Sequence, residues 1–399
     1  MTPATAGERP LRVLLVTGAY APEMSSGGLQ SQMVAQALAD RVAFRVLTTA
    51  VDRTLPRRSI VDGLPVSRIA VDVDRRRSKL AAVGPMLSEL TRLLRHTDVV
   101  HVHGYSQKNV PVTAVAKVLG VPIVLSLHTA GFDEPATILR HGRLARWALK
   151  APSLYVTVSP HLADACTAAG LPPNKIRHVP NGVNLERFWP AAPLERATIR
   201  RSLGLPPDSR IVLFVGFFSR EKQPHVLFDA WLRLQERGLV STLVFVGATR
   251  SSYFEVDNRL ADDMRARARA AGVSDRLLFA EPTPRIDDYY RSADVFALPS
   301  SREGLPVALL EAMASGVPAV ASRLPGSTDV VIDDGRTGVL VAPGDVGALA
   351  DAIGRLLTDR AWATELGKAA RQCVASDFSA DRTAQGWLEA YQTVTRSIA

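Results

Sequence analysis

The 399-residue sequence has little cysteine, few aromatic residues and no long apolar run. Its two cysteines, Cys166 and Cys373, lie far apart in the chain, which excludes a disulfide framework and a thiolate zinc cluster. Aromatic residues make up 6% of the chain, too few to favour a stacking platform for single-stranded nucleic acid. No stretch approaches the roughly 20 apolar residues of a membrane span, and the first ten residues carry no apolar leader. We therefore expect a cytoplasmic globular protein.

The excess positive charge lies in the first half of the chain. Residues 1–190 hold 23 Lys and Arg against 13 Asp and Glu, a net charge of +10, whereas residues 191–399 hold 25 against 26, a net charge of −1. A one-sided basic field attracts nucleic acid, acidic lipid headgroups or a phosphorylated substrate. The alternative is an arginine-rich composition with solvated side chains, and the asymmetry counts against it.

Buried-strand patterns alternate with helical segments in two series. The first series begins at Leu11–Thr17 and continues at residues 44–48, 99–102, 123–127 and 155–158. A Pro- and Ala-rich stretch near residues 185–208 interrupts it. The second series begins at Ile211–Val215 and continues at residues 243–246, 277–279, 295–298, 319–321 and 338–341. This alternation predicts an α/β protein with two doubly wound sheets and a ligand cleft between them.

The strongest local signal is a strand, loop and short helix at residues 295–318. The helix is expected to begin at Pro306, which suits a first helical turn, and to end before Gly316, which suits the left-handed position after a helix. The N–H groups of residues 305–308 and the positive end of the helix dipole would form a phosphate site.

Two carboxylates flank this predicted phosphate site. Glu303 precedes the helix and Glu311 lies within it, so they could bind hydroxyl groups on either side of a diphosphate. The alternative makes Glu303 a capping acid and Glu311 a solvated helix residue. Glu311 has apolar neighbours in sequence, and an unpaired buried acid is costly, which favours the binding role.

Upstream of this segment, Gly216 ends a strand and is followed by Arg220 and Lys222, which alone would be an ordinary charged loop. Beside a helix-end anion site they predict a diphosphate clamp.

Several segments in order resemble the retaining glycosyltransferases of family 4, which have the GT-B fold of two Rossmann-like domains facing across a cleft. The resemblance covers residues 11–375 and is carried by Gly27-Gly28, Asp98–His103, Val158-Ser159, Val179–Asn184, the E-x7-E pair Glu303–Glu311, and Gly335–Val341. It implies an N-terminal acceptor-binding domain at residues 1–190, a nucleotide-sugar-binding domain at 191–375, and a C-terminal helix at 376–399 that packs toward the N-terminal domain.

The resemblance also assigns roles to site residues. Glu303 would approach the hydroxyls of the donor sugar, and Glu311 would hold the ribose. Lys222 matches the lysine of the family's diphosphate clamp, but the clamp arginine is replaced by Phe217 and the glycine after the lysine is replaced by Gln223. We infer that Arg220 substitutes for the arginine. The remaining donor-binding residues are expected to be Gly216, Gly304, Leu305, Pro306, Val307 and Ala308.

Two further features lie in the first half. His128 follows the strand at 123–127 and matches a family histidine near the transferred sugar; the alternative is a hydrogen-bonded loop histidine. Gly27 and Gly28 would let the backbone approach a phosphate or the acceptor closely.

The implied reaction transfers a hexosyl group from a GDP- or UDP-linked sugar to an acceptor hydroxyl with retention, in the synthesis of cell-envelope glycans, glycolipids or small glycosides. We expect no protein nucleophile, no cofactor and no metal. Asp72-Val-Asp74 and His101-Val-His103 have metal-like spacing, but neither has the sequence context of a metal site.

Two basic segments predict peripheral contact with an anionic membrane at the inner face of the plasma membrane, and a lipid-linked or phosphorylated acceptor. They are Arg75–Lys79, which leads into an apolar helix face, and Arg140–Trp147. The alternative is that the apolar stripes are core and the arginines solvated.

Two other functions remain open. A sugar-nucleotide 2-epimerase shares the two-domain fold, although E-x7-E with the Val179–Asn184 segment favours transfer. A basic, non-enzymatic nucleic-acid-binding protein would explain the charge of the first half, but the scarcity of aromatic residues counts against it.

Overall fold

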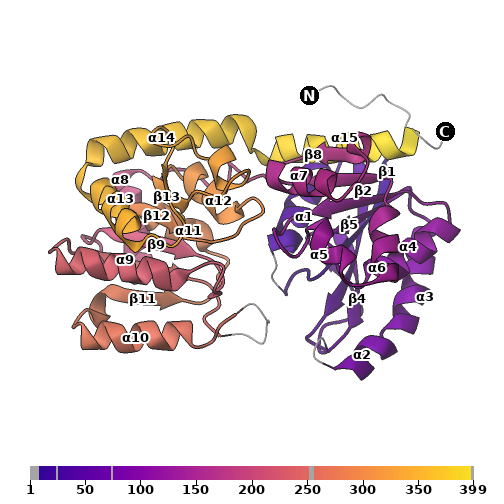
Figure 1. Cartoon of the computed structure of the whole chain (residues 1–399), viewed down its shortest axis with the longest axis horizontal. Helices are drawn as coiled ribbons and strands as arrows, with labels where there is room; N and C mark the ends of the chain where they lie inside the picture. The colour runs from indigo at the N-terminus through magenta and orange to yellow at the C-terminus, as the bar shows by residue number, and fades with distance from the viewer. Residues whose placement is uncertain (1–8, 24–25, 73–74, 251–255, 397–399) are drawn as a thin grey trace. The chain divides into compact units, whose positions relative to one another are not determined.

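The computed structural model describes residues 9–23, 26–72, 75–250 and 256–396. The chain divides into two compact units, of which unit 1 comprises Met1–Gly182 with Ala380–Ala399 and unit 2 comprises Val183–Ser379. Each unit is a Rossmann-like α/β domain with a largely or wholly parallel sheet between helices (Figure 1).

Unit 1 contains an eight-stranded sheet in the order β3-β4-β2-β1-β5-β6-β7-β8, in which only the β3–β4 pair is antiparallel. Its strands are β1 Leu11–Thr17, β2 Val42–Ala50, β3 Arg58–Val61, β4 Leu64–Ala70, β5 Val99–His103, β6 Ile123–Leu127, β7 Leu154–Thr157 and β8 Ile176–His178. Strands β5, β6 and β7 are buried along their whole length, as expected for apolar strands covered on both faces. The chain runs outward from β1 in one direction through β2 and in the other through β5, so the topological switch point lies between β1 and β5.

The helices of unit 1 are α1 Ser26–Ala37, α2 Arg76–Ala81, α3 Val83–Leu94, α4 Asn109–Val118, α5 Pro135–Leu139, α6 Arg143–Lys150, α7 Pro160–Ala168 and α15 Ala380–Arg396. Helix α4 packs against both α3 and α6. Helix α15 packs against α1 and the strands β5, β6 and β7, and it buries Trp387 and Tyr391 in the core. The last helix of the chain is therefore part of unit 1.

Unit 2 contains a six-stranded parallel sheet in the order β11-β10-β9-β12-β13-β14, with the switch point between β9 and β12. Its strands are β9 Ile211–Val215, β10 Thr242–Val246, β11 Leu277–Ala280, β12 Val295–Leu298, β13 Ala319–Ser322 and β14 Val339–Val341. Its helices are α8 Pro193–Ser202, α9 Pro224–Glu236, α10 Leu260–Ala270, α11 Ile286–Ser292, α12 Val307–Ala314, α13 Val346–Thr358 and α14 Arg360–Asp377. The core gathers Phe214, Phe218 and Phe245 with Trp231 of α9.

The unit boundaries differ from the predicted ones. Unit 1 gives way to unit 2 after Gly182, not after residue 190, and the chain returns to unit 1 at Ala380, not at residue 376. The reason is local pairing, because Val183 forms a bridge with Ser379 and donates a backbone hydrogen bond to Phe378 O at 2.9 Å. Farther along, the ring of Phe188 lies 5.8 Å from that of Tyr290, which anchors this segment in unit 2.

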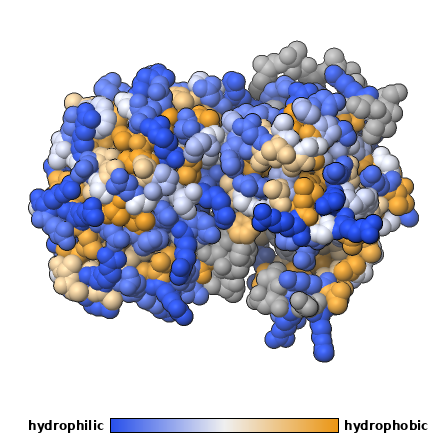
Figure 2. Space-filling view, in the orientation of Figure 1, coloured by the Kyte–Doolittle hydropathy of each residue, from blue (hydrophilic) through white to orange (hydrophobic). Residues whose placement is uncertain are grey.

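The surface is that of a globular domain protein. On the face shown in Figure 2, hydrophilic residues predominate and apolar residues are scattered among them. Among the described residues, no helix combines the length and the apolar character that crossing a membrane would require.

A close backbone approach fixes α14 against the end of α12. A Cβ atom at Gly367, in the buried face of α14, would lie 2.3 Å from the carbonyl oxygen of Gly316. Gly316 itself has φ of 69° and ends α12, the helix that carries Glu311. The packing of α14 therefore helps to determine where α12 ends.

We expect Gly367→Ala to destabilise unit 2 by about 1–3 kcal/mol, because the added methyl group must displace the backbone at Gly316. Gly84→Ala is the matched control, since Gly84 is also helical but no atom lies within 4 Å of its added Cβ. The control should be neutral or stabilising by up to about 1 kcal/mol. Thermal unfolding of both variants measures the difference, and equal melting temperatures would contradict the close-packing argument.

Candidate active-site residues of the two units

An ion pair occupies the switch point of unit 2. The ammonium nitrogen of Lys222 lies 2.7 Å from Glu303 Oε1 and 2.8 Å from Oε2. Lys222 follows β9 and Glu303 follows β12, which are neighbouring strands. The carboxyl ends of these parallel strands meet at the sheet edge where the strand order reverses, which is where open α/β sheets bind ligands.

Local hydrogen bonds hold both members of the pair. The hydroxyl of Ser300 donates to Glu303 Oε1 at 2.7 Å, and the backbone N–H of Lys222 donates to Ser219 Oγ at 3.1 Å. The side chain of Glu303 is 7% exposed and that of Lys222 is 31% exposed. The lysine is therefore the more accessible partner of the pair.

The residue after Lys222 has an uncommon backbone conformation. Gln223, which stands where the resembling family has glycine, adopts φ of 50° at the start of α9. Side chains other than those of Asn and Asp rarely adopt this region, and it costs about 1–2 kcal/mol. The chain thus keeps the geometry that a glycine would favour, which directs Lys222 toward Glu303.

Helix α12 begins beside Glu303. It starts at Val307 with Pro306 as its N-cap, one residue later than predicted, and Gly304 and Leu305 are buried in the loop before it. First-turn N–H groups have no partner within their own helix, and together with the helix dipole they attract anions. The amides of Val307 and Ala308 are the first-turn groups here.

Glu311 is a partly buried acid with a specific partner. The hydroxyl of Tyr290, in α11, donates to Glu311 Oε2 at 2.8 Å. Burial raises the pKa of Glu311 to about 7, although the hydrogen bond from Tyr290 and the charge of Arg187 both favour the ionised form. This is not the solvated helix residue of the alternative interpretation. Sequence reasoning did not identify Tyr290, because a tyrosine in an ordinary helix gives no signal of its partner.

The predicted clamp arginine lies apart from the ion pair. Arg220 Nε donates to Asp257 Oδ2 at 3.2 Å, and its side chain is 82% exposed. Its role in binding a diphosphate stays a prediction. Gly216 lies at the end of β9, where its N–H donates to Val246 O at 3.0 Å. A Cβ atom at the neighbouring Gly247 would lie 2.0 Å from Gly216 O, so Gly247 is needed for this approach.

Two stacked histidines lie near the switch point of unit 1. The rings of His103, the last residue of β5, and His128, just after β6, are 3.7 Å apart and 13° from parallel. A Cβ atom at Gly27, in the first turn of α1, would lie 2.8 Å from His103 Cδ2. Position 27 therefore favours glycine, because a larger side chain there would collide with the ring of His103. Gly28 is buried next to it, and contact of either glycine with a ligand stays a prediction.

A buried carboxylate positions the loop that carries His128. Asp133 Oδ2 accepts from the backbone N–H groups of His128 at 2.8 Å and Thr129 at 2.9 Å, and Oδ1 accepts from Tyr105 N–H at 2.8 Å. The ring of His128 contacts Ser126 Oγ through Nε2 at 2.8 Å. Burial lowers the pKa of His128 to about 4, so the ring is neutral near pH 7. No local motif pointed to Asp133, because its partners are backbone amides from two different loops.

The two metal-like motifs have different outcomes. His101 is packed in the core, with its ring 4.4 Å from that of Trp387 and its Nδ1 2.8 Å from Tyr391 OH. Asp74 lies outside the described residues, so the Asp72-Val-Asp74 motif is not described. Within the described ranges, no cluster of three or more His, Cys, Asp or Glu side chains could hold a metal ion.

Known proteins match the chain along most of its length. The family model for Glycosyltransferase Family 4 matches residues 30–187, and the model for Glycosyl transferases group 1 matches residues 195–373. The chain is 30% identical to a D-inositol 3-phosphate glycosyltransferase of Kribbella flavida over the whole of both proteins. It is 32% identical to the protein of the same name from Actinosynnema mirum, over 92% of each.

Solved structures support the same architecture. Anabaena HepE in complex with UDP and glucose has a TM-score of 0.79 at 19% identity, covering 96% of this chain and 99% of HepE. A sucrose-phosphate synthase from Thermosynechococcus elongatus has a TM-score of 0.79 at 22% identity, covering 97% of this chain and 100% of the synthase. At these identities the likeness establishes the fold.

Glu311 should make stability depend on pH. Its raised pKa means that the folded state binds the proton more tightly than the unfolded state. The resulting stabilisation is complete below the usual pKa near 4.5 and is lost as pH rises toward 7. From pH 5 to pH 8 the wild type should lose up to about 3 kcal/mol relative to Glu311→Gln. Tyr290→Phe removes the bond to the ionised form and should enlarge that loss. If the melting temperatures of wild type and Glu311→Gln changed in parallel with pH, the raised pKa of Glu311 would be contradicted.

Proposed function

Because the chain belongs to glycosyltransferase family 4 and has the GT-B fold, we propose that it transfers a hexosyl group from a GDP- or UDP-linked sugar to an acceptor hydroxyl with retention of configuration. The observation that carries the proposal is the Lys222–Glu303 pair beside the first turn of α12, at the switch point of the unit 2 sheet. A cation, a row of amides and a fixed carboxylate are what a sugar diphosphate requires.

Each part of the donor has a candidate partner in unit 2. We assign the diphosphate to Lys222 and to the first-turn amides of α12, since cations and helix N-termini both favour phosphate oxygens. Glu303, held in place by Lys222 and Ser300, would accept hydrogen bonds from sugar hydroxyls. Glu311 would accept from the ribose, and binding would favour its ionised form.

The proposed mechanism needs no protein nucleophile. The bond between the anomeric carbon and the phosphate oxygen breaks as Lys222 and the α12 amides stabilise the departing diphosphate. The acceptor oxygen forms its bond to the anomeric carbon on the same face, and its proton passes to the departing phosphate. The products are the glycoside and a nucleoside diphosphate. Glu303 is held by Ser300 and Lys222, which suits hydrogen bonding to hydroxyls better than attack on carbon. In unit 1, neutral His128 would hydrogen-bond a substrate hydroxyl.

We propose a phosphorylated polyol or a lipid-linked hydroxyl as the acceptor, bound by unit 1. Two observations support this. The relatives named above are D-inositol 3-phosphate glycosyltransferases, and the chain's excess positive charge lies in residues 1–190. The proposal also places the enzyme in the cytoplasm, in peripheral contact with an anionic membrane.

The diphosphate clamp is tested by binding of GDP, UDP and ADP to matched variants. Lys222→Met should weaken the preferred nucleotide by about 10- to 150-fold, the range for losing one charge-assisted hydrogen bond of about 1.5–3 kcal/mol. Arg220→Met removes the same charge two residues away, from a side chain that pairs with Asp257. An equal loss in both variants would make Arg220 the missing clamp cation. Absence of nucleotide binding in the wild type would refute the proposal.

Glu303 is tested by separating nucleotide binding from transfer. Glu303→Ala should bind the nucleoside diphosphate within about threefold of wild type but lose at least about 100-fold in transfer, since its contacts are to the sugar. Glu221→Ala is the control and should retain activity, because the half-buried Glu221 pairs with Arg302 and not with Lys222. Incubating the donor without acceptor separates transfer from epimerisation, because conversion of the donor to its C-2 epimer would identify the alternative enzyme.

A further inference from the structure

Helices α4 and α6 of unit 1 form a surface of unusual composition, which we call the α4–α6 patch. Its cations and apolar residues are Lys117, Arg143, Arg146, Lys150, Val118, Leu144 and Trp147. The two helices pack together, and a surface hollow joins them, lined by Lys117 of α4 and by Arg143, Arg146, Trp147 and Lys150 of α6. The patch is therefore one continuous surface.

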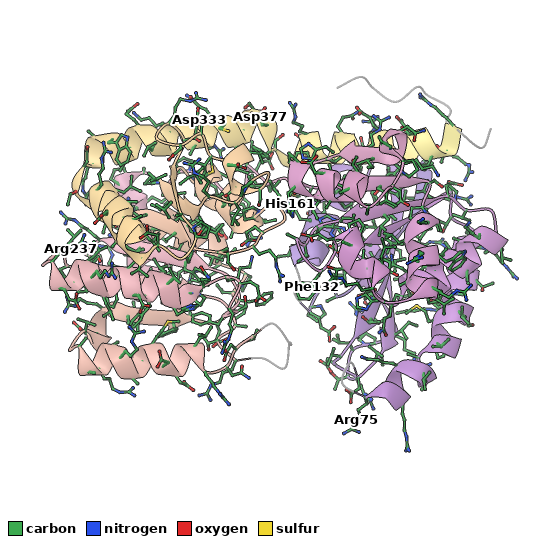
Figure 3. All side chains as sticks on the ribbon, in the orientation of Figure 1. Arg75, Phe132, His161, Arg237, Asp333 and Asp377 are labelled. Atoms are coloured by element: carbon green, nitrogen blue, oxygen red, sulfur yellow. The ribbon has the colours of Figure 1, made fainter. Side chains whose placement is uncertain are left out.

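The cations of the patch have no acidic counterpart. Within the described residues, no ion pair and no side-chain hydrogen bond involves the four cations Lys117, Arg143, Arg146 and Lys150. The sequence contains no Asp or Glu at 99–132 or 135–163. The intervening Glu134 accepts from Gly131 N–H and lies 2.9 Å from His161, which Figure 3 labels.

Arginines in two other basic segments of the protein do have acidic partners. On α10, Arg265 pairs with Asp262 at 3.1 Å and Arg267 pairs with Asp229 at 2.6 Å. In the first basic segment of the sequence, Arg75 (Figure 3) pairs with Asp72 at 3.3 Å. Exposed arginines of this protein can thus have acidic partners, whereas the four cations of the α4–α6 patch have none among the described residues.

The apolar residues of the patch do not belong to the core. Helix α6 turns Ala145, Ala148 and Leu149 inward, and its other face carries the cations with Leu144 and Trp147. Leu144 is 67% exposed, Trp147 is 39% exposed, and Val118 at the end of α4 is 84% exposed. Burying these three side chains outside the fold would gain free energy without disturbing the domain.

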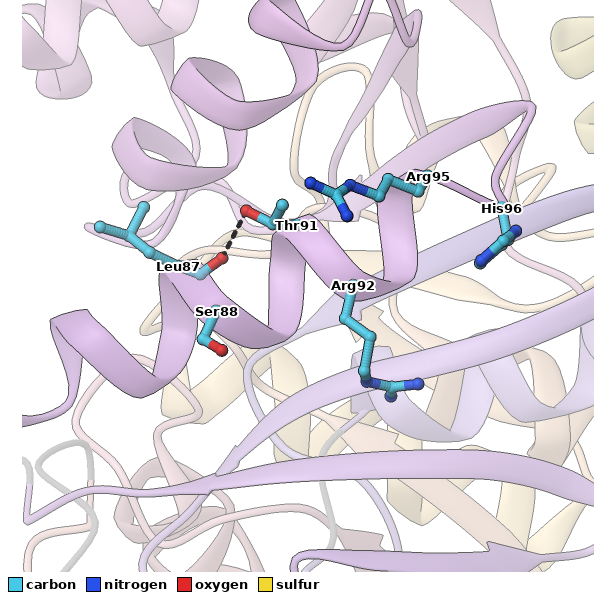
Figure 4. Close-up of a pocket in the computed structure, with 6 residues that line it drawn as sticks. All are labelled: Leu87, Ser88, Thr91, Arg92, Arg95 and His96. Atoms are coloured by element: carbon cyan, nitrogen blue, oxygen red, sulfur yellow. Dashed lines mark hydrogen bonds between the residues drawn. The ribbon is translucent and has the colours of Figure 1, made fainter.

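The helix on the other side of α4 has a similar composition. Helix α3 packs against α4 and carries the shallow pocket of Figure 4, lined by Leu87, Ser88, Thr91, Arg92, Arg95 and His96. Before this pocket, Val83 of α3 is 45% exposed, and Leu80 of α2 is 73% exposed. Exposed apolar side chains near cations therefore occur on α2 and α3 as well as on α4 and α6.

We infer that the α4–α6 patch docks on the surface of an anionic lipid bilayer, with Trp147, Leu144 and Val118 entering the interface and the four cations meeting headgroup phosphates. Tryptophan favours the interface, and lysine and arginine extend their charged ends to headgroups while their stems cover apolar surface. A second copy of the chain is a poorer partner, because the four unpaired cations of one patch would face the same four cations of the other. A nucleic-acid backbone would leave Leu144 and Val118 without apolar partners.

This inference deepens the membrane contact of the proposed function, but its test needs neither donor nor acceptor. The full chain is sedimented with vesicles of phosphatidylcholine alone and with vesicles containing phosphatidylglycerol. Binding should require the anionic lipid and fall as salt rises. Equal binding to both vesicle types, or no binding to either, would overturn the inference.

Charge variants locate the surface. Arg143→Gln/Arg146→Gln/Lys150→Gln should reduce partitioning by roughly 100-fold, at about fivefold for each cation removed. The control Arg265→Gln/Arg267→Gln/Arg269→Gln changes the net charge equally on α10 and should bind nearly as wild type. If both triple variants lost vesicle binding equally, net charge alone would explain the binding, and the assignment to the α4–α6 patch would be overturned.

Apolar variants separate the bilayer from other anionic partners. Leu144→Ser/Trp147→Ser should weaken vesicle binding by at least about tenfold but leave binding of soluble glycerol phosphate unchanged. Tighter binding to duplex DNA than to anionic vesicles, lost in the charge variant, would identify a nucleic-acid surface instead. A change of oligomeric state in either variant would identify a contact between copies. Nucleotide binding of the same variants is measured separately, so failure of the donor site and failure of the membrane surface are distinguishable.

Discussion

The ion pair between Lys222 and Glu303 depends on the topology of the unit 2 sheet, and the proposed donor site depends on the ion pair. The pair forms because β9 and β12 are neighbours although they are far apart in sequence, so the loops after them meet at one edge. Without a ligand, the ammonium group and the carboxylate are each other's ion-pair partner. A bound diphosphate would share the lysine, which places sugar hydroxyls within reach of Glu303. The ion pair thus keeps the side chains of Lys222 and Glu303 in place before a ligand binds.

Much of this fold could be predicted because central strands of parallel sheets are continuous apolar runs. Predicted strands such as Ile211–Val215 and Ile123–Leu127 coincide with β9 and β6. The edge hairpin of β3 and β4 was missed, since the side chains of β3 alternate between partly buried and exposed positions and give no such run. Its turn at Asp62 and Gly63, both at positive φ, was the available signal, because Asp-Gly between short strands favours a tight hairpin turn.

The site was predictable to the extent that its chemistry is local. Residues 298–318 carry Glu303, Glu311 and the start of α12 in one short segment, so the strand, loop and helix could be predicted from spacing and capping residues, whereas phosphate binding there stays a prediction. The partners Tyr290, Ser300 and Asp133 are brought in by tertiary packing, and a hydroxyl or carboxylate in isolation does not indicate which backbone or acid it will meet. The same limit applies to Gly27, because its partner His103 is the last residue of β5, which is far away in the sequence.

The two units stabilise their polar groups in opposite ways. Near the switch point of unit 1, burial favours the neutral form of the histidines, lowering the pKa of His101 to about 3 and that of His128 to about 4. At the switch point of unit 2, an ion pair and helix-end amides favour charge. A neutral ring can exchange hydrogen bonds with hydroxyls without attracting a diphosphate, whereas a lysine attracts one. We infer that this contrast favours unit 2 for the diphosphate of a sugar nucleotide, whose hydroxyls we assign to Glu303 and Glu311 of the same unit, although unit 1 carries the greater net positive charge. That excess charge is then available to its outer helices, where the α4–α6 patch leaves it unpaired.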